Sequence, residues 1–238
     1  MRPTIVLDFD GTLALGNGPI SAFARAIAAH AGDATFLGRA EAALAAFEAG
    51  EAEYRDGYDA VSRVAAAEGI ARERLDAAYA ASRELLGSDD ALVDPPQGLR
   101  EFLHGLSARA RLVLATNAPA GRILDVLEAW GVAEVFDDLH FAVGKPHGLV
   151  PVLREALEQG AVLAIGDIAE FDLDPATALG ADTALVGVTA AHSAAATTMR
   201  GHSLADLYDE ITAWVHAAPP LLTPSADSLP HHTIERNH

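Results

Sequence analysis

Short, continuously apolar runs alternate along this chain with segments whose apolar residues recur at helical spacing. The runs at 5–7, 111–115 and 161–165 predict buried strands, because each is apolar, apart from Arg111 at the start of the second, and too short for a helix. A further strand is predicted at 183–188, and a mixed run spans 139–143. Amphipathic helices are predicted at 99–106, 123–130, 150–157 and 204–215. Alternation of this kind predicts an α/β fold with a parallel sheet covered by helices on both faces.

The pattern changes to helices alone between residues 18 and 92. Apolar and aromatic residues there recur at three- and four-residue intervals, and alanine is abundant, which predicts about four short helices. The segment 94–98, Asp-Pro-Pro-Gln-Gly, is expected to be the hinge that returns the chain to the sheet. We therefore divide the chain into a core (1–17 and 93–218), a helical insert (18–92) and a disordered tail (219–238). The alternative is that the helices belong to one common core.

Two carboxylates follow the first predicted strand. Asp8 and Asp10 are two residues apart, and strand side chains repeat every two residues, so both are expected at the carboxyl edge of the sheet. Open α/β sheets bind their ligands at that edge. Two neighbouring acids repel each other unless a cation or a proton neutralises one of them, and either outcome suits phosphoryl chemistry. Alternatively, both acids only cap the next turn, and Gly11 supplies a tight bend.

Polar residues also follow three other predicted strands. Thr116 and Asn117 follow the second strand and offer the hydroxyl and amide donors that a phosphate group needs. Lys145 follows the mixed run, Asp167 follows Gly166 directly, and Asp172 comes five residues later. Each segment alone is typical of a strand followed by a polar turn. Together with the Asp8 and Asp10 segment, these make four motifs, and their order along the chain favours a single functional site.

This order of motifs resembles the haloacid dehalogenase superfamily. Its members carry DxDGT, then Thr or Ser, then Lys, then GDxxxxD, and the resemblance covers the chain from Thr4 to about Val188. It implies a Rossmann-like parallel sheet core with an inserted all-helical cap, in a phosphatase of the phosphoglycolate phosphatase-like type. Many relatives carry Ser or Thr after the last Gly-Asp and Asn before the final Asp, where this chain has Ile168 and Phe171.

The resemblance implies a nucleophile and a metal site among the acids. Asp8 would attack phosphorus and become an aspartyl phosphate, and Asp10 would act first as general acid and then as general base. Mg2+ would be held by the Asp8 carboxylate, the Asp10 backbone carbonyl and Asp167. Oxygen ligands of this kind suit Mg2+.

The resemblance also implies a phosphate-binding pocket. Thr116 would hydrogen-bond the phosphoryl oxygens, with Gly11 and Asn117 beside it, and Lys145 would balance the phosphoryl charge. Asp172 would orient Lys145. The chain has fifteen arginines and a single lysine, and that lysine is Lys145, which suggests that an ammonium is required at this position.

The net charge of the chain limits the classes of molecule that we expect it to bind. The formal net charge is −18, from 34 acidic and 16 basic residues, which argues against binding nucleic acid or an anionic membrane surface. The first predicted strand begins close to Met1 and no apolar stretch is long enough to span a bilayer, so we expect a cytoplasmic protein. The expected partner is a small phosphorylated metabolite. Oligomeric state has no signature in the sequence.

The leading functional hypothesis is a Mg2+-dependent phosphatase acting on a small phosphate monoester. Dehalogenases of the superfamily lack the second acid, so Asp10 argues against that reaction. Phosphonate-cleaving relatives use a cap lysine, and this insert has none. A phosphosugar mutase and a non-catalytic binding protein are the alternatives. Candidate substrate contacts in the insert are Arg39, Tyr54, Arg55 and Arg63, and His147 is a further candidate in the core.

Overall fold

The computed structural model describes residues 2–31, 35–50 and 54–218, and its centre is a six-stranded parallel sheet. The strand order is β3-β2-β1-β4-β5-β6. The bounds are Thr4–Leu7 (β1), Arg111–Ala115 (β2), Asp138–His140 (β3), Val162–Gly166 (β4), Asp182–Leu185 (β5) and Met199–Arg200 (β6). The α/β fold expected from the sequence is therefore confirmed. The fifth strand is shorter than predicted, and β6, with only two residues, has no apolar run by which sequence reasoning finds strands.

Register within the sheet brings three strand ends together. β1 lies between β2 and β4, and Leu7 pairs with Leu114 on one side and with Ile165 on the other. All three strands run parallel, so the residues that follow them emerge at one edge. The Asp8 backbone N–H still donates to the Ile165 carbonyl at 3.0 Å, which fixes the start of the loop after β1.

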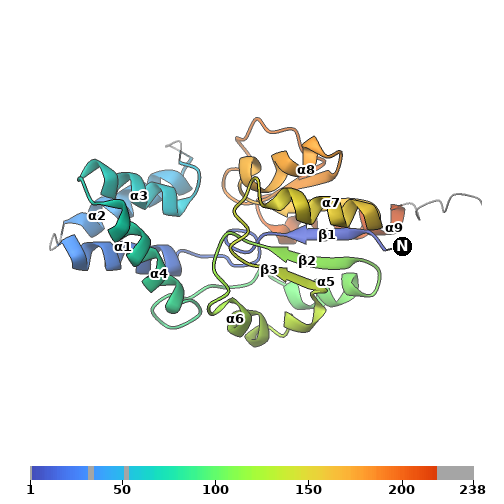
Figure 1. Cartoon of the computed structure of the whole chain (residues 1–238), viewed down its shortest axis with the longest axis horizontal. Coiled ribbons are helices and arrows are strands. Elements are labelled where there is room, and N and C mark those ends of the chain that lie inside the picture. Colours follow the sequence, from blue (N-terminus) through green and yellow to red (C-terminus); the bar gives the residue numbers. More distant parts are fainter. Residues whose placement is uncertain (1, 32–34, 51–53, 219–238) are drawn as a thin grey trace, which may run out of the picture.

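Helices cover both faces of the sheet, as alternating buried side chains require (Figure 1). Ile5 and Leu7 of β1 pack in one hydrophobic cluster with α5, α6 and α9, whereas Val6 packs in a second cluster with α7 and α8. These helices are α5 (Leu99–Ser107), α6 (Ile123–Ala129), α7 (Leu149–Gln159), α8 (Asp174–Ala178) and α9 (Tyr208–Ala217). Shorter helical turns are η1 (Ala133–Val135), η2 (Ala169–Leu173) and η3 (Leu204–Leu207).

Four helices from the first half of the chain form a separate group, which we call the helical unit (Figure 1). They are α1 (Gly18–Ala31), α2 (Phe36–Glu48), α3 (Gly57–Ala67) and α4 (Arg72–Glu84). The unit has its own hydrophobic cluster, in which Phe23, Ile27, Phe36 and Val61 are almost fully buried. The four helices expected between residues 18 and 92 are thus present, and they do not share the core of the sheet.

Two antiparallel chain segments connect the helical unit to the sheet. Leu15 and Asp94 exchange two backbone hydrogen bonds of 2.9 and 3.0 Å. Close beside them, a Cβ on Gly18 would lie 2.2 Å from the Leu92 carbonyl oxygen, so only glycine allows the outgoing and returning segments to approach this closely.

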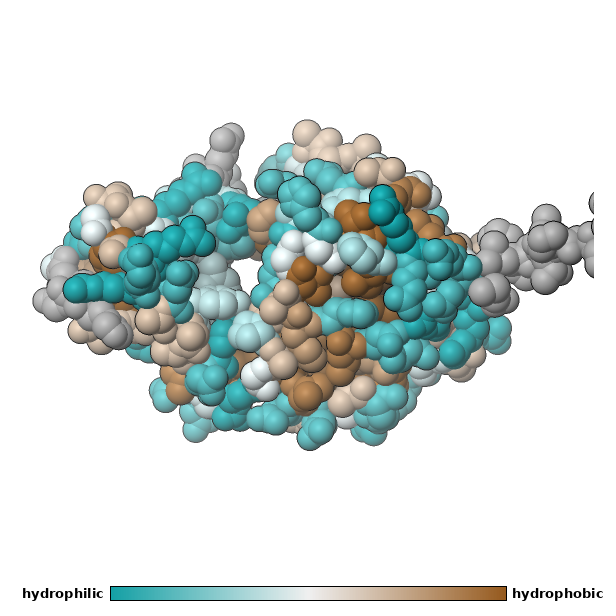
Figure 2. All heavy atoms as spheres, in the orientation of Figure 1, coloured by the Kyte–Doolittle hydropathy of each residue, from teal (hydrophilic) through white to brown (hydrophobic). Residues whose placement is uncertain are grey.

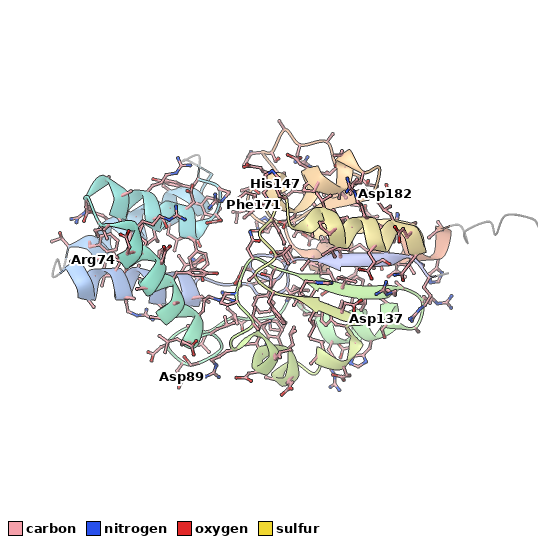
Figure 3. The ribbon with its side chains drawn as sticks, in the orientation of Figure 1. Arg74, Asp89, Asp137, His147, Phe171 and Asp182 are labelled. Carbon is pink, nitrogen blue, oxygen red and sulfur yellow. The ribbon has the colours of Figure 1, made fainter. Side chains whose placement is uncertain are left out.

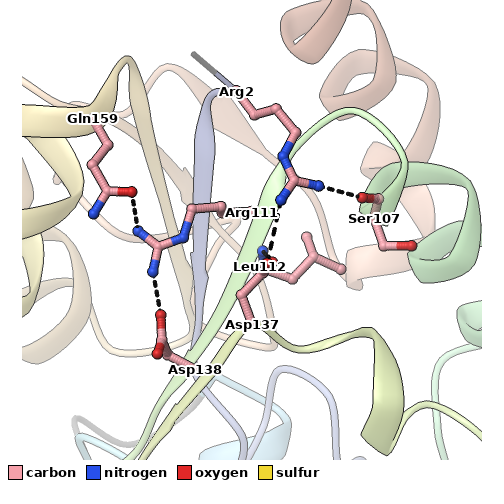
Figure 4. Close-up of polar contacts among 7 residues, drawn as sticks. All are labelled: Arg2, Ser107, Arg111, Leu112, Asp137, Asp138 and Gln159. Carbon is pink, nitrogen blue, oxygen red and sulfur yellow. Dashed lines mark hydrogen bonds and ion pairs between the residues drawn. The ribbon is translucent and has the colours of Figure 1, made fainter.

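The opposite edge of the sheet, away from the helical unit, is held by side chains (Figure 4). Arg111 at the start of β2 donates to Asp138 of β3 and to Gln159 at the end of α7. Asp137 accepts a 2.9 Å hydrogen bond from the Leu112 backbone N–H. These contacts fix the relative positions of neighbouring strands and so support the register at the other edge.

No helix in the described part of the chain is long and apolar enough to cross a membrane. The tail predicted to be disordered, 219–238, lies outside the described residues.

Candidate active site

A cavity of about 550 Å³ lies between the carboxyl edge of the sheet and the helical unit. Figure 2 shows the hollow between these two parts of the molecule. The motif residues to which the sequence analysis assigned a role all line this cavity: Asp8, Asp10, Gly11, Thr116, Asn117, Lys145, Asp167 and Asp172. Four segments that are far apart in the sequence therefore meet at one place.

Lys145 lies between two carboxylates. Its Nζ donates to Asp8 Oδ1 at 2.6 Å and to Asp172 Oδ1 at 2.7 Å, and the residue is only 8% exposed. Burial alone would lower the pKa of Lys145, but the Asp8 and Asp172 charges outweigh it and raise that pKa above its ordinary value. The ammonium is therefore charged at neutral pH and faces Asp8 directly.

Asp172 is held in place by the backbone of its own loop. Its Oδ2 accepts a 3.0 Å hydrogen bond from the Ile168 N–H. A Cβ on Gly166 would lie 2.3 Å from the Asp172 carboxyl group, so the strand must end in glycine for this carboxylate to fit. The departure at Ile168 leaves this backbone contact intact, because the side chain takes no part in it.

The acids have the features of a divalent cation site. Carboxylate oxygens of Asp8, Asp167 and Asp172 lie within 4.8 Å of one another, and both oxygens of Asp172 are already engaged as described above. Asp167 Oδ1 is buried and has no hydrogen-bond partner among the described residues. A Cβ on Gly11 would lie 2.2 Å from Asp167 Oδ2, so glycine lets the loop after β1 reach this carboxylate. Asp8 and Asp167 are thus the two carboxylates available to a cation.

Burial and mutual repulsion raise the pKa values of these two acids. Burial raises the pKa of Asp8 from 3.8 to about 7, although the Lys145 charge opposes the shift. Burial, and then the Asp8 charge, raise the pKa of Asp167 well above its ordinary value. A divalent cation would remove this repulsion, and the all-oxygen donor set fits Mg2+. The Asp10 carbonyl, expected as a third ligand, accepts no hydrogen bond within the described chain.

Thr116 and Asn117 anchor the neighbouring loops. Thr116 Oγ1 accepts a 3.1 Å hydrogen bond from the Ala118 N–H, which leaves its hydroxyl hydrogen free to donate into the cavity. Asn117 Oδ1 accepts a 2.7 Å hydrogen bond from the Lys145 backbone N–H. Asn117 therefore holds the loop that carries Lys145 and keeps its side-chain NH2 for a ligand.

The expected contacts from residues 18–92 are largely different from those found. Arg55 lines the cavity, and its guanidinium lies 4.8 Å from the ring centroid of Phe171, which faces the helical unit in Figure 3. Arg39 instead pairs with Glu68 at 2.6 Å. These residues were selected by type alone, and type does not indicate which face of a helix meets the sheet.

Tyr54 and Arg63 do not line the cavity either. The Arg63 guanidinium lies 5.5 Å from the Tyr54 ring centroid, and Arg63 pairs with Asp59 at 2.9 Å on the surface of the helical unit. His147 is exposed and also lies outside the cavity lining.

Sequence reasoning missed Arg83, which enters the site from helix α4. Arg83 is 2% exposed, and its Nη1 donates to Asp10 Oδ1 at 2.8 Å. Tyr58 and Tyr79 of the helical unit lie close to it and line the cavity. A signal was present, because Arg83 follows Tyr79 by four residues and so shares the buried face of α4.

A family model described as haloacid dehalogenase-like hydrolase matches residues 3–180. The chain belongs to this family. A comparison with curated proteins finds no matching sequence.

Solved structures share the fold at low sequence identity. A Bacillus subtilis protein described as the HAD-hydrolase YfnB, in a magnesium-bound form, aligns with a TM-score of 0.60 at 17% identity over 89% of this chain and 99% of that one. A HAD phosphatase from Thermococcus onnurineus gives 0.54 at 16% identity, covering 88% and 97%. A 2-haloacid dehalogenase from Pseudomonas syringae gives 0.53 at 18% identity, covering 90% and 100%. Since both chemistries occur among these structures, the reaction has to be argued from the site.

Proposed function

We propose that this hydrolase is a Mg2+-dependent phosphatase that acts on a small phosphate monoester through an aspartyl phosphate on Asp8. The observation that carries the proposal is the surroundings of Asp8. Its carboxylate accepts a hydrogen bond from the Lys145 ammonium and has an oxygen within 4.8 Å of a carboxylate oxygen of Asp167, whose Oδ1 has no hydrogen-bond partner among the described residues. A carboxylate can attack a phosphate dianion only if positive charge offsets their repulsion. Lys145 supplies one such charge, and Mg2+ bound at Asp8 and Asp167 would supply the other.

Each residue of the site has a distinct part in this reaction. Asp8 attacks phosphorus, while Lys145 and the Thr116 hydroxyl stabilise the charge on the phosphoryl oxygens. Asp10 gives a proton to the leaving alcohol and afterwards takes one from the water that hydrolyses the aspartyl phosphate. Bound Mg2+, held by Asp8 and Asp167, would supply charge that neutralises the phosphoryl group and orients it.

The second acid separates this reaction from dehalogenation. A halide leaves without a proton, whereas an alcohol leaving from a phosphate ester needs one. Asp10 lines the cavity with its side chain 32% exposed, so it is accessible to a substrate. This position favours ester hydrolysis.

The cavity suits a small substrate. Its volume of about 550 Å³ falls within the usual range for small-molecule sites, and residues of the helical unit such as Phe47 and Tyr58 close one side. We assign residues 18–92 as a cap that covers the substrate side of the cavity, and residues 1–17 with 93–218 as the catalytic core.

The test is a panel of phosphorylated metabolites assayed with the purified protein. We expect release of inorganic phosphate that requires Mg2+ and stops when EDTA is added. Asp8→Asn should abolish the release, because an amide is a poor nucleophile and a poorer metal ligand. Dominant isomerisation of a sugar phosphate would instead identify a mutase. Near wild-type turnover by Asp8→Asn would contradict the covalent mechanism.

A further inference from the structure

Arg83 is a buried cation that joins the helical unit to the catalytic loop. It lies near the end of α4, yet its Nη1 contacts Asp10 Oδ1 at 2.8 Å, 73 residues away in the sequence. Its side chain is 2% exposed. The contact therefore connects the helical unit with one specific side chain of the site described above.

The surroundings hold this guanidinium firmly. Tyr58, whose OH lies 3.4 Å from Arg83 Nη1, packs with Tyr79 at 5.4 Å between ring centroids, and both rings pack against Phe23. Aromatic rings in mutual contact have few alternative rotamers. Arg83 therefore contacts Asp10 from a cluster of closely packed aromatic side chains.

Stability alone is a poor reason for this arrangement. Arg83 Nε and Nη2 are buried and have no hydrogen-bond partner among the described residues. Unmatched buried donors cost free energy, and buried ion pairs often contribute no net stability compared with apolar replacements. The arrangement is better explained by what it does to Asp10.

The contact leaves the two oxygens of Asp10 with different tasks. Oδ1 is held by Arg83, whereas no hydrogen bond from the described residues reaches Oδ2. A guanidinium N–H can only donate, so Oδ1 must accept, and a proton on this carboxyl group has to reside on Oδ2. Asp10 lines the cavity and is partly exposed, so Oδ2 is the oxygen available to a ligand.

We propose that Arg83 is a positioning residue, which holds Asp10 through Oδ1 so that Oδ2 carries the proton to the leaving oxygen. This inference rests on the proposed phosphatase reaction. On this inference, the helical unit determines the orientation of the general acid, Asp10.

Two substrates with different leaving groups test the inference. A nitrophenyl phosphate releases an acidic phenol that needs little help from a general acid, whereas a simple alkyl phosphate releases an alcohol that depends on it. The quantity to compare is kcat/KM, because it covers the steps up to release of the leaving group. For Arg83→Met we expect kcat/KM to fall roughly a hundredfold for the alkyl ester and less than about fivefold for the aryl ester. Arg83→Lys, which keeps one donor, should show the same pattern with a smaller loss.

Arg63→Met is the matched control. Arg63 is also an arginine of the helical unit, but it is 59% exposed, pairs with Asp59 and lies outside the cavity lining. Both kcat/KM values should stay within about twofold of wild type, as for a surface substitution away from the site. Thermal melting of each variant shows whether it is folded, and if Arg83→Met does not fold, Arg83→Lys decides the question.

Asp10→Asn is the reference for the expected pattern. If it lowers kcat/KM far more for the alkyl than for the aryl ester, and a folded Arg83 variant does the same, the inference is supported. Equal losses for both esters in folded Arg83 variants would overturn it and make the contact a latch between the two parts of the chain. A wild-type protein without Mg2+-dependent phosphate release would instead contradict the proposed function.

Discussion

At the scale of single residues, Lys145 has the most demanding position. Its Nζ reaches Asp8 at 2.6 Å and Asp172 at 2.7 Å, in a space that leaves its side chain 3% exposed. An ammonium is a compact charge with three donors, whereas a guanidinium is broad and planar. The chain uses arginine at all fifteen of its other basic positions, which fits a strict requirement for lysine here.

We predict that Lys145→Arg lowers kcat at least about a hundredfold, the scale of losing one preorganised contact to a transition state. Charge is conserved, but the wider group should displace Asp8 from its line of attack, and small displacements of reacting groups are costly. Steady-state kinetics on the best substrate of the panel measures the effect. Arg154→Lys, an exchange at an exposed position of α7, is the control. Equal kcat for wild type and Lys145→Arg would contradict this role.

At the scale of elements, the sequence predicted the strands that carry the site, placed a mixed run at 139–143 that partly overlaps β3, and missed β6. β1, β2 and β4 are apolar apart from Thr4 and Arg111 at the first positions of β1 and β2, because both faces of the sheet are covered, and this makes them recognisable in the sequence. β3 and β6 are edge strands of three and two residues, so β3 overlaps the mixed run only at residues 139 and 140, and β6 is too short to form a pattern. The closing helix begins as the 3₁₀ turn η3, where Ser203 and Asp206 form a capping box.

The residues of the candidate site likewise divide into those that the sequence predicted and those that it did not. Residues that follow buried strands, such as Asp8 and Thr116, were predictable because the sheet register determines where they emerge. Arg83 was not predictable as a residue of the site, although its place on the buried face of α4 was predictable. Its partner depends on how the helical unit sits against the sheet, and no local pattern of residues specifies that orientation.

At the scale of the whole molecule, the buried acids link stability to pH and metal. The pKa of Asp8 rises from 3.8 to about 7 on folding without metal, and that of Asp167 is also raised. The folded state then binds more protons than the unfolded state between about pH 4 and 7. The contribution of these acids to stability is present below about pH 4 and is lost as the pH rises through about 7.

We therefore predict that Mg2+ raises Tm more at pH 7.5 than at pH 5, by several degrees, since the cation relieves a repulsion that protons relieve at lower pH. Melting curves with Mg2+ and with EDTA at both pH values measure this. Asp167→Asn, which removes one carboxylate, should lose most of the Mg2+ effect. An equal gain in Tm at both pH values would show that these acids do not bind the metal.

The central claim is that Asp8 becomes phosphorylated, and the most direct measurement is to trap that species. Asp10→Asn should still accept a phosphoryl group from a nitrophenyl phosphate, which needs little acid, but should hydrolyse the aspartyl phosphate slowly for lack of a base. Acid-quenched Asp10→Asn, digested and analysed by mass spectrometry, should show one phosphoryl group on the peptide that contains Asp8. Release of nitrophenol and phosphate by this variant with no phosphorylated peptide at any time would contradict the account.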